Sequence, residues 1–441
     1  MSESEPGLFE ASEIASTPEK PAEPGVARTR EPQRAQTEIR FSVPDDLVTA
    51  SNPARLFWEL LGRLDLTGFG LECGSVEGKA GRSMLSPRML LTLWLYAISE
   101  GVGSAREIER LTKRDTVYRW IVGDLEVSHH KLSRFRVGHG EALNGLMTDV
   151  LASLMEKGLL SLDLLADDGT RTRAAASAPS FRTYGSLLEC RAQAALHLKA
   201  VLAAADDPEY TRAQHTRRAA AARDLQQRVE AAIATVTEIQ EQRTPAQNQK
   251  LKPARASTTD AEARVMKMGD GGFRPAYNVQ YAVAGSELGG PRTIVAAQVT
   301  NVGSDMGDLT PMVKQVEERT GQLPKVLLAD GGHAKAEDIT TLKGMGVDVL
   351  VPPPENAKSI DKLKAEGAGA EVINWRERMN TPAAAKAYRA RAGLCELANA
   401  HQKSHHGLTQ FLVRGLDKVT CVTLLSAIAF NLSQHASHLL R

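Results

Sequence analysis

The chain has 441 residues, enough for about two or three domains with a substantial core. Lys and Arg total 54 and Asp and Glu 53, so the net charge is only +1, and contacts to a nucleic acid would need local clusters of basic residues. The four cysteines form no CxxC pair, the acidic N-terminus has no apolar signal segment, and the apolar runs are too short to span a bilayer. We therefore expect a cytoplasmic protein without membrane contact.

The first part of the chain is predicted to be a tail followed by helices. Residues 1–38 are rich in Glu, Pro, Ser, Thr and Ala and poor in large apolar residues, which predicts a disordered tail. Residues 39–160 have helical patterns: "NPARLFWELLGRL" opens on a capping Asn, and "SPRMLLTLWLYAISEG" has Ser86 as its cap. Two further helical stretches end at glycines. Short helices with basic starts favour a helix-turn-helix-like DNA-binding domain; a bundle that only packs on its neighbour is the alternative.

Strand-like sequence in residues 161–184 is interrupted by an insertion, residues 185–258. The insertion is dominated by Ala, Arg, Gln and Glu, which favours a helical hairpin, Leu187 to Gln242, protruding from the fold. Its narrow apolar seam suits pairing of the two helices with each other or with a second protomer. A solvated strut is the alternative.

Residues 259–441 continue with strands and helices. "YNVQYAV" alternates residue by residue, which predicts a half-buried strand, and "RTIVAAQVT" is expected to pair beside it. An amphipathic helix in "DLTPMVKQVEERTG", a buried strand in "PKVLLADGG", a short helix, a strand in "VDVLVPPP" and a final helical region follow. This order predicts an α/β core with a mixed sheet. Asp260 is expected to cap a turn.

Two matching phrases suggest a metal site. "LLADDGT" and "LLADGG" each end an apolar run on an aspartate followed by glycine, at Asp168 and Asp330. If the two strands are neighbours, both carboxylates leave the sheet at one edge, and Mg²⁺ takes such oxygen ligands. A third carboxylate would make a two-metal phosphoryl-transfer site feasible. The candidate is Glu396, aligned on a helix with Arg389 and Lys403 by spacings of seven. Exposed turn residues are the alternative.

At these motifs the sequence resembles a known family. "DGTRTRAAAS", "YNVQ", "LLADGGH" and "YRARAGLCE", followed by Lys403 and "FLVRGLDKV", are similar to the motifs of bacterial insertion-sequence transposases of the DDE type. "SAREIERLTKRDTVYRWIVG" resembles that family's amino-terminal helical domain. The resemblance covers roughly residues 40–435. It implies a ribonuclease H-like core in residues 161–184 and 259–441, dependence on Mg²⁺ with Mn²⁺ as a substitute, and DNA cleavage with strand transfer.

The resemblance also implies roles for individual residues. The catalytic metal ligands are Asp168 (rather than Asp167), Asp330 and Glu396, and His333 stands where an aromatic residue usually follows the second aspartate. The expected DNA contacts are Tyr388, Arg391, Lys403 and Arg414 in the C-terminal part and Arg114, Arg119, Lys131, Arg134 and Arg136 in the N-terminal helices.

The implied partner is double-stranded DNA, as element ends and as target, in the nucleoid. Because transposition joins two ends, a homodimer or larger assembly on DNA is expected. A degenerate or domesticated DNA-binding protein derived from a transposase is the alternative.

Overall fold

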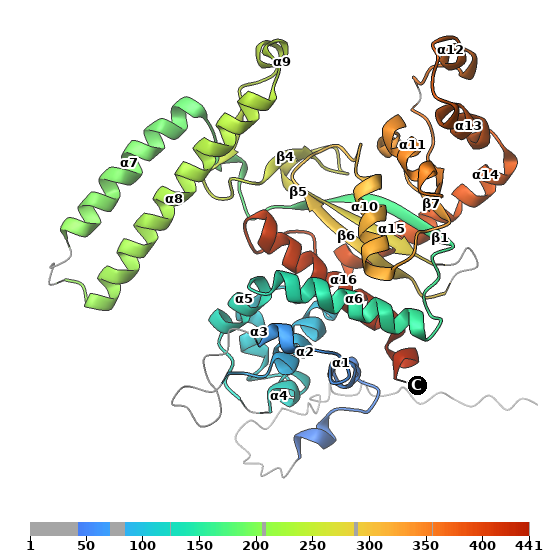
Figure 1. Cartoon of the computed structure of the whole chain (residues 1–441). Coiled ribbons are helices and arrows are strands. Elements are labelled where there is room, and N and C mark those ends of the chain that lie inside the picture. The colour runs from blue at the N-terminus through green and yellow to red at the C-terminus, as the bar shows by residue number, and fades with distance from the viewer. Residues whose placement is uncertain are drawn as a thin grey trace, which may run out of the picture. The chain divides into compact units, whose positions relative to one another are not determined.

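The computed structural model describes residues 43–70, 84–123, 125–204, 209–285, 290–354 and 356–440. The predicted disordered tail, residues 1–38, lies outside these residues. From Val43 onward the chain forms one compact unit, in which a mixed sheet is surrounded by helices (Figure 1).

The N-terminal part is helical, as predicted. Its helices are η1 (Pro44–Leu47), α1 (Pro53–Leu61), η2 (Thr67–Phe69), α2 (Pro87–Ser99), α3 (Ala105–Leu111), α4 (Thr116–Val122), α5 (His129–Val137) and α6 (Gly140–Glu156). The caps expected from the sequence are present: Asn52 Oδ1 accepts from the Ala54 amide at 2.9 Å, and the Ser86 hydroxyl accepts from Met89. The two helical stretches predicted after α2 each form two helices, α3 with α4 and α5 with α6. Between α3 and α4 the division falls at Asp115, whose carboxylate caps the amides of Val117 and Tyr118.

The sheet is mixed, as predicted. Its strands are β1 (Leu164–Arg173), β4 (Arg264–Lys267), β5 (Phe273–Ala284), β6 (Thr293–Thr300), β7 (Val326–Leu328) and β8 (Asp348–Leu350). The order is β4-β5-β1-β7-β8, with β6 also paired to β5. β1 is antiparallel to β5 and parallel to β7, and β7 is parallel to β8.

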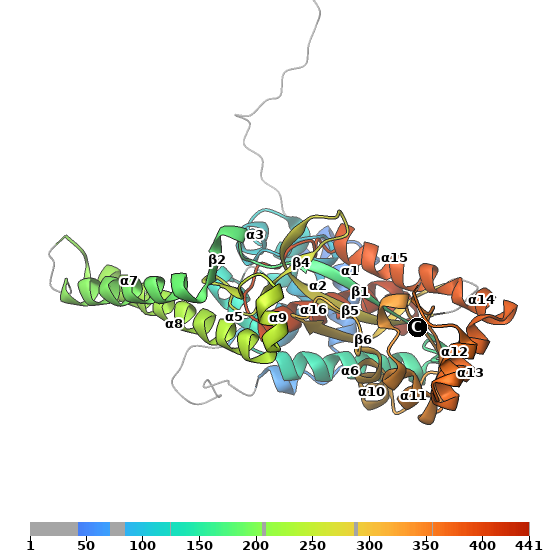
Figure 2. The same cartoon turned by 90° about the horizontal axis from the view of Figure 1, so that it is seen from above.

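The helices after β6 are α10 (Leu309–Thr320), α11 (Ala336–Gly344), α12 (Ile360–Ala365), α13 (Ala370–Met379), α14 (Pro382–Tyr388), α15 (Ala390–Ser404) and α16 (Leu416–Leu439). α15 contacts β1 and β5 on one face of the sheet, and α10 and α16 contact β6 on the other (Figures 1 and 2). The expectation that "YNVQYAV" forms a half-buried strand is therefore wrong. Helices cover both faces, so β5 is buried continuously from Pro275 to Ala284.

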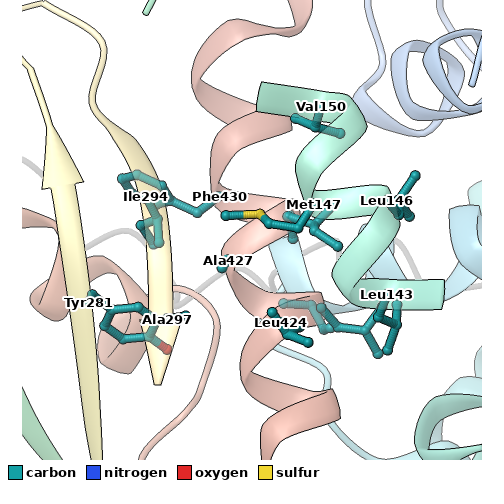
Figure 3. Packing of buried hydrophobic residues seen from close by; sticks show 14 of the residues in the cluster. Leu143, Leu146, Met147, Val150, Tyr281, Ile294, Ala297, Leu424, Ala427 and Phe430 are labelled. Atoms are coloured by element: carbon teal, nitrogen blue, oxygen red, sulfur yellow. The ribbon is translucent and has the colours of Figure 1, made fainter. Parts of the chain in front are cut away.

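Helix α16 joins the N-terminal helices to the sheet. It contacts α1, α2, α5 and α6 as well as β6, and Figure 3 shows Phe430 between Ile294 of β6 and Met147 of α6. The Asn431 side chain bonds both the amide and the carbonyl of Ile294 at 2.8 Å. Among the described helices, α16 alone is long and apolar enough to cross a membrane, and 67% of that window is buried inside the protein.

The predicted helical hairpin is present. It consists of α7 (Tyr184–Ala203) and α8 (Arg212–Gln242), which lie side by side and extend away from the sheet; α9 (Pro245–Lys250) follows (Figures 1 and 2). Its seam is narrow: the buried side chains are Leu187, Ala194, Val201, Ala222, Val229, Ala232 and Val236. A two-stranded sheet of β2 (Phe181–Thr183) and β3 (Arg255–Ser257) closes its base.

Asp260 is expected to cap a turn, but its side chain bonds to distant segments instead. The residue is 4% exposed, accepts a hydrogen bond from the Tyr277 hydroxyl at 2.8 Å and accepts another from the Gly415 amide at 3.2 Å. The carboxylate therefore joins β5 to the start of α16, because a buried charge needs donors that only distant segments supply here.

Candidate active site

The pairing of β1 with β7 places two aspartates next to each other. The strands run parallel with Ala166 opposite Leu328, so Asp168 and Asp330, each two residues further on, leave the paired region at the same level. β7 ends at Leu328, whereas β1 continues because it stays paired with β5, where Asp168 lies opposite Tyr281. The expectation that the two aspartates come from neighbouring strands is confirmed.

Arg391, near the start of α15, contacts both carboxylates. Its Nη2 donates to Asp168 Oδ1 at 2.9 Å and lies 3.9 Å from Asp330 Oδ2. The other oxygen of Asp168 accepts from Asn399 Nδ2, also at 2.9 Å. Burial raises the pKa of Asp168 despite Arg391. Burial lowers the pKa of Arg391, but Asp168 together with the other acidic groups around it outweighs burial and raises the pKa of the guanidinium. The Asp168 carboxylate is therefore largely shielded from solvent, and each of its oxygens accepts a hydrogen bond.

Asp330 is held by the turn that follows it. Its Oδ1 accepts from the Gly332 amide at 2.8 Å and lies 3.0 Å from Nδ1 of His333. The hydrogen bond with His333 and the other nearby positive groups lower the pKa of Asp330 to about 2, although burial acts against them. Burial alone would lower the pKa of His333, which is fully buried, but Asp330 and Asp167 raise it to about 9. The other oxygen, Oδ2, lies 3.9 Å from Nη2 of Arg391.

Asp167 lies beside Asp168 in the chain but belongs to the other face of β1, since side chains alternate along a strand. It is fully buried, and neither of its oxygens has a hydrogen-bond partner among the described residues. Burial raises its pKa to about 7, with His333 acting in the opposite direction. Of the two neighbouring aspartates, Asp168 is the one that bonds to side chains of α15.

Glu396 lies apart from this pair. It is an exposed residue of α15, and Asn399, three residues later, occupies the position against Asp168. Three residues correspond to about 300° around a helix, so Glu396 points about 60° away from Asn399. Within the described part of the chain, no group of three His, Cys, Asp or Glu side chains is arranged to hold a metal ion. The structure brings together two of the three predicted ligands.

The other predicted contacts in the C-terminal part vary in position. Lys403 is half-buried on α15, where burial lowers its pKa and nearby Asp168 opposes that shift. Tyr388 ends α14 and packs partly buried against the apolar cluster beneath the site. Arg414 is exposed before α16. Asn399, which the sequence analysis does not single out, lies two turns after Arg391 on α15 and contacts the other oxygen of Asp168.

Four of the five basic residues predicted in the N-terminal helices lie at the surface. These are Arg114, Arg119, Lys131 and Arg134. Arg136 does not: it is 6% exposed, its guanidinium lies 4.6 Å from the centre of the Trp94 ring, and it donates to the Gly103 carbonyl at 2.7 Å. It therefore lies on the inner side of α5, away from the exposed face that carries the other basic residues.

Two protein families match this chain. Residues 44–138 match the Transposase domain (DUF772), which corresponds to η1 through α5, and residues 360–436 match the Transposase DDE domain, which includes α15 and most of α16. No curated protein and no solved structure gave a match. Both matched families are transposase domains, and the paired aspartates lie in the sequence between the two matched regions. More particularly, they support an insertion-sequence transposase of the DDE type.

Proposed function

We propose that this transposase cleaves double-stranded DNA at the ends of its element and joins them to target DNA by Mg²⁺-dependent phosphoryl transfer. One observation carries the proposal: Asp168 and Asp330, from neighbouring parallel strands, converge on a single nitrogen of Arg391. Neither matched domain includes β1 or β7, so this convergence is independent of the family matches. A mixed sheet with carboxylates on two adjacent strands also supports a ribonuclease H-like core.

The two aspartates fit a divalent cation. Both present oxygen atoms toward one positively charged group, and Mg²⁺ is commonly held by one or two carboxylates, with water and substrate phosphate completing its shell. Asp168 and Asp330 would hold the ion, and Mn²⁺ suits the same ligands. When bound, the ion would polarise the phosphodiester and stabilise the charge of the displacement. We keep Glu396 as the third ligand, brought in when DNA binds beside α15.

The surrounding side chains have separate tasks in this proposal. Arg391 offsets the repulsion between Asp168 and Asp330, and its guanidinium is placed to contact a scissile phosphate that enters between them. Asn399 keeps the Asp168 carboxylate oriented. Lys403, half-buried near Asp168, is placed for a phosphate on the flanking nucleotide.

Recognition of the element ends is assigned to the N-terminal helices. Arg114 precedes α4, Arg119 lies on α4, and Lys131 and Arg134 lie on α5; all four are exposed. Phosphate contacts from such residues give affinity that falls steeply with salt. We further propose that two or more protomers assemble on DNA, since two ends must be joined, and that the hairpin of α7 and α8 helps to build that assembly.

The second candidate function is DNA binding without cleavage. The placement of Glu396 at an exposed position outside the aspartate pair favours it. A protein that no longer cleaves DNA would still need the basic surface of the N-terminal helices, but it would not need a third carboxylate at the site.

One experiment separates the two functions. Nicking of a duplex that carries the element's inverted repeats, found in the flanking genomic DNA, is measured with Mg²⁺, with Mn²⁺ and with chelator. Asp168→Asn and Asp330→Asn should abolish nicking and retain DNA binding, because each removes a metal ligand and no phosphate contact. Asp361→Asn, which removes an exposed carboxylate of α12, is the control. Retained binding without nicking in the unaltered protein would favour the second function, and normal nicking by either site variant would remove that residue from the site.

A further inference from the structure

A pocket lies where the N-terminal helices meet the catalytic part of the chain. Its volume is about 350 Å³, and its walls come from the end of α2, the turn that follows it, α5, α16 and the segment 406–412 between α15 and α16. This volume is at the lower end of the range for small-molecule sites. Neither matched domain nor the proposed active site assigns a role to it.

The buried guanidinium of Arg136 lines this pocket. Arg136 is 94% buried, its Nη1 donates to the Gly103 carbonyl, and its Nε has no hydrogen-bond partner among the described residues. No carboxylate of the described chain forms an ion pair with it, and burial lowers its pKa to about 10. It is still charged at neutral pH. The Trp94 ring, 4.6 Å from the guanidinium, stabilises this charge in part, and the cavity beside Arg136 leaves room for a counter-ion.

The other polar side chains of the lining are engaged by neighbours. The carboxylate of Glu107 forms an ion pair with Arg110, whose Nε donates to it at 2.8 Å. His406, 3% exposed, is held at Nδ1 by the Ser426 hydroxyl at 3.0 Å. Arg136 is therefore the charged side chain of the lining that has no ion-pair partner among the described residues.

The pocket is held between two backbone segments in close contact. Gly101, with a φ of 76°, and Gly407, with a φ of 66°, approach so closely that a Cβ on Gly407 would lie 2.9 Å from the Gly101 carbonyl oxygen. The walls on the α2 side and on the α15–α16 side are thus fixed relative to each other. A ligand here would contact both the N-terminal helices and the catalytic part.

We infer that this pocket binds a phosphoryl group, with Arg136 as the residue that recognises it. A guanidinium forms charge-assisted hydrogen bonds with phosphate, and Arg136 lines the cavity without a carboxylate partner among the described residues. A phosphate of DNA and free inorganic phosphate share this chemistry. The DNA source rests on the proposed function; the free ion does not.

The test measures binding of inorganic phosphate to the full chain by calorimetry. Leu412 lines the pocket and is 58% exposed, so Leu412→Glu places a competing carboxylate at the mouth without disturbing the core. We expect phosphate to bind this variant at least tenfold more weakly. Leu196→Glu makes the same charge change at a 69% exposed position on α7 and should leave the affinity unchanged.

Arg136→Lys keeps the charge but removes the planar fork, and it too should weaken binding about tenfold, with thermal unfolding used to verify that it folds. Displacement of bound phosphate by a short duplex would identify DNA as the source, and retention would identify the free ion. No phosphate binding by the unaltered protein, or equal binding by Leu412→Glu and Leu196→Glu, would overturn the inference. Because nicking is not measured, this result is independent of the proposed catalysis.

Discussion

Truncation of Phe430 should weaken the N-terminal helices and the sheet together. Phe430 is fully buried on α16, between Ile294 of the sheet and Met147 of α6 (Figure 3). Phe430→Ala removes a large apolar group from a site whose walls belong to different elements and cannot all collapse inward. Such substitutions cost about 3–5 kcal/mol. Because the neighbours on both sides lose contacts, both parts of the chain should become less stable in the same transition.

The size of the shift follows from the length of the cooperative unit. With an unfolding entropy of about 2.1 cal/mol/K per residue, a unit of about 400 residues loses about 5 °C in Tm for a change of about 4 kcal/mol. Differential scanning calorimetry would show one transition moved by this amount. Ser433→Ala, an exposed position of the same helix, should move it by less than about 1 °C. Two transitions, of which only one responds, would refute the idea that α16 couples the two parts.

Three further outcomes are expected. Burial lowers the pKa of His435 to about 4, below its unfolded value, so the folded protein holds this imidazole neutral. The stabilisation that goes with the neutral ring is fully present above pH 6.5 and is lost as the pH falls. Urea unfolding should show the free energy of unfolding fall by about 2 kcal/mol between pH 7 and pH 5, and His435→Gln should reduce this fall. Gly407→Ala should cost at least about 1–2 kcal/mol in the same assay because of its positive φ and the facing carbonyl oxygen, whereas Gly145→Ala, in an open helical position, should be neutral or stabilising. His333→Phe removes the hydrogen bond that orients Asp330, so nicking should require about tenfold more Mg²⁺ with DNA affinity unchanged, and an unaltered Mg²⁺ requirement would exclude that orienting role.

Local sequence signals predict most of the helices and strands, but they do not predict which segments pack against each of them. Caps such as Asn52 and Ser86 mark helix starts because they act on amides a few residues away. The burial of β5 depends on helices that are distant in the sequence and cover both faces of the sheet. The polar side chains of Asn278 and Gln280 tolerate this burial because each donates to Asp305 at 2.6 Å, in a loop about 25 residues further on. The alternating pattern therefore predicts exposed polar side chains at positions where the fold buries them and supplies a hydrogen-bond acceptor.

The same limit applies to α16. Its residues are buried on nearly every side, so the sequence shows an apolar helix without a preferred face. Such a pattern predicts burial but not the elements that cover it. The expectation of an N-terminal domain ending at residue 160 could not include the contribution of α16, which packs against α1, α2, α5 and α6. A fragment ending there would expose that apolar surface, so DNA binding is better measured on the full chain.

At the candidate site, the two matching sequence motifs predict that Asp168 and Asp330 lie close together. This follows because neighbouring parallel strands keep equivalent residues at the same level. To place Glu396, one must also know how α15 is oriented about its own axis, because a spacing of seven residues gives only the angles between side chains on the helix. Leu394, Cys395 and Ala398 are buried and set that rotation. At about 100° per residue, Glu396 lies more than about 90° from the middle of this buried stripe, while Asn399 lies nearer to it.

The apolar positions on α15 were visible in the sequence, and weighing them would have placed Asn399 toward Asp168 and Glu396 on the exposed flank. A third carboxylate ligand therefore requires α15 to turn or shift against β1, which would break the hydrogen bond from Asn399 to Asp168. DNA that supplies phosphate groups to Arg391 would release Asp168 from its ion pair and lower the cost of that movement. On this reasoning Asn399→Ala, which removes one of the two bonds holding Asp168, should lower the Mg²⁺ concentration needed for nicking if Glu396 joins the site, and should raise it if Asn399 only orients Asp168.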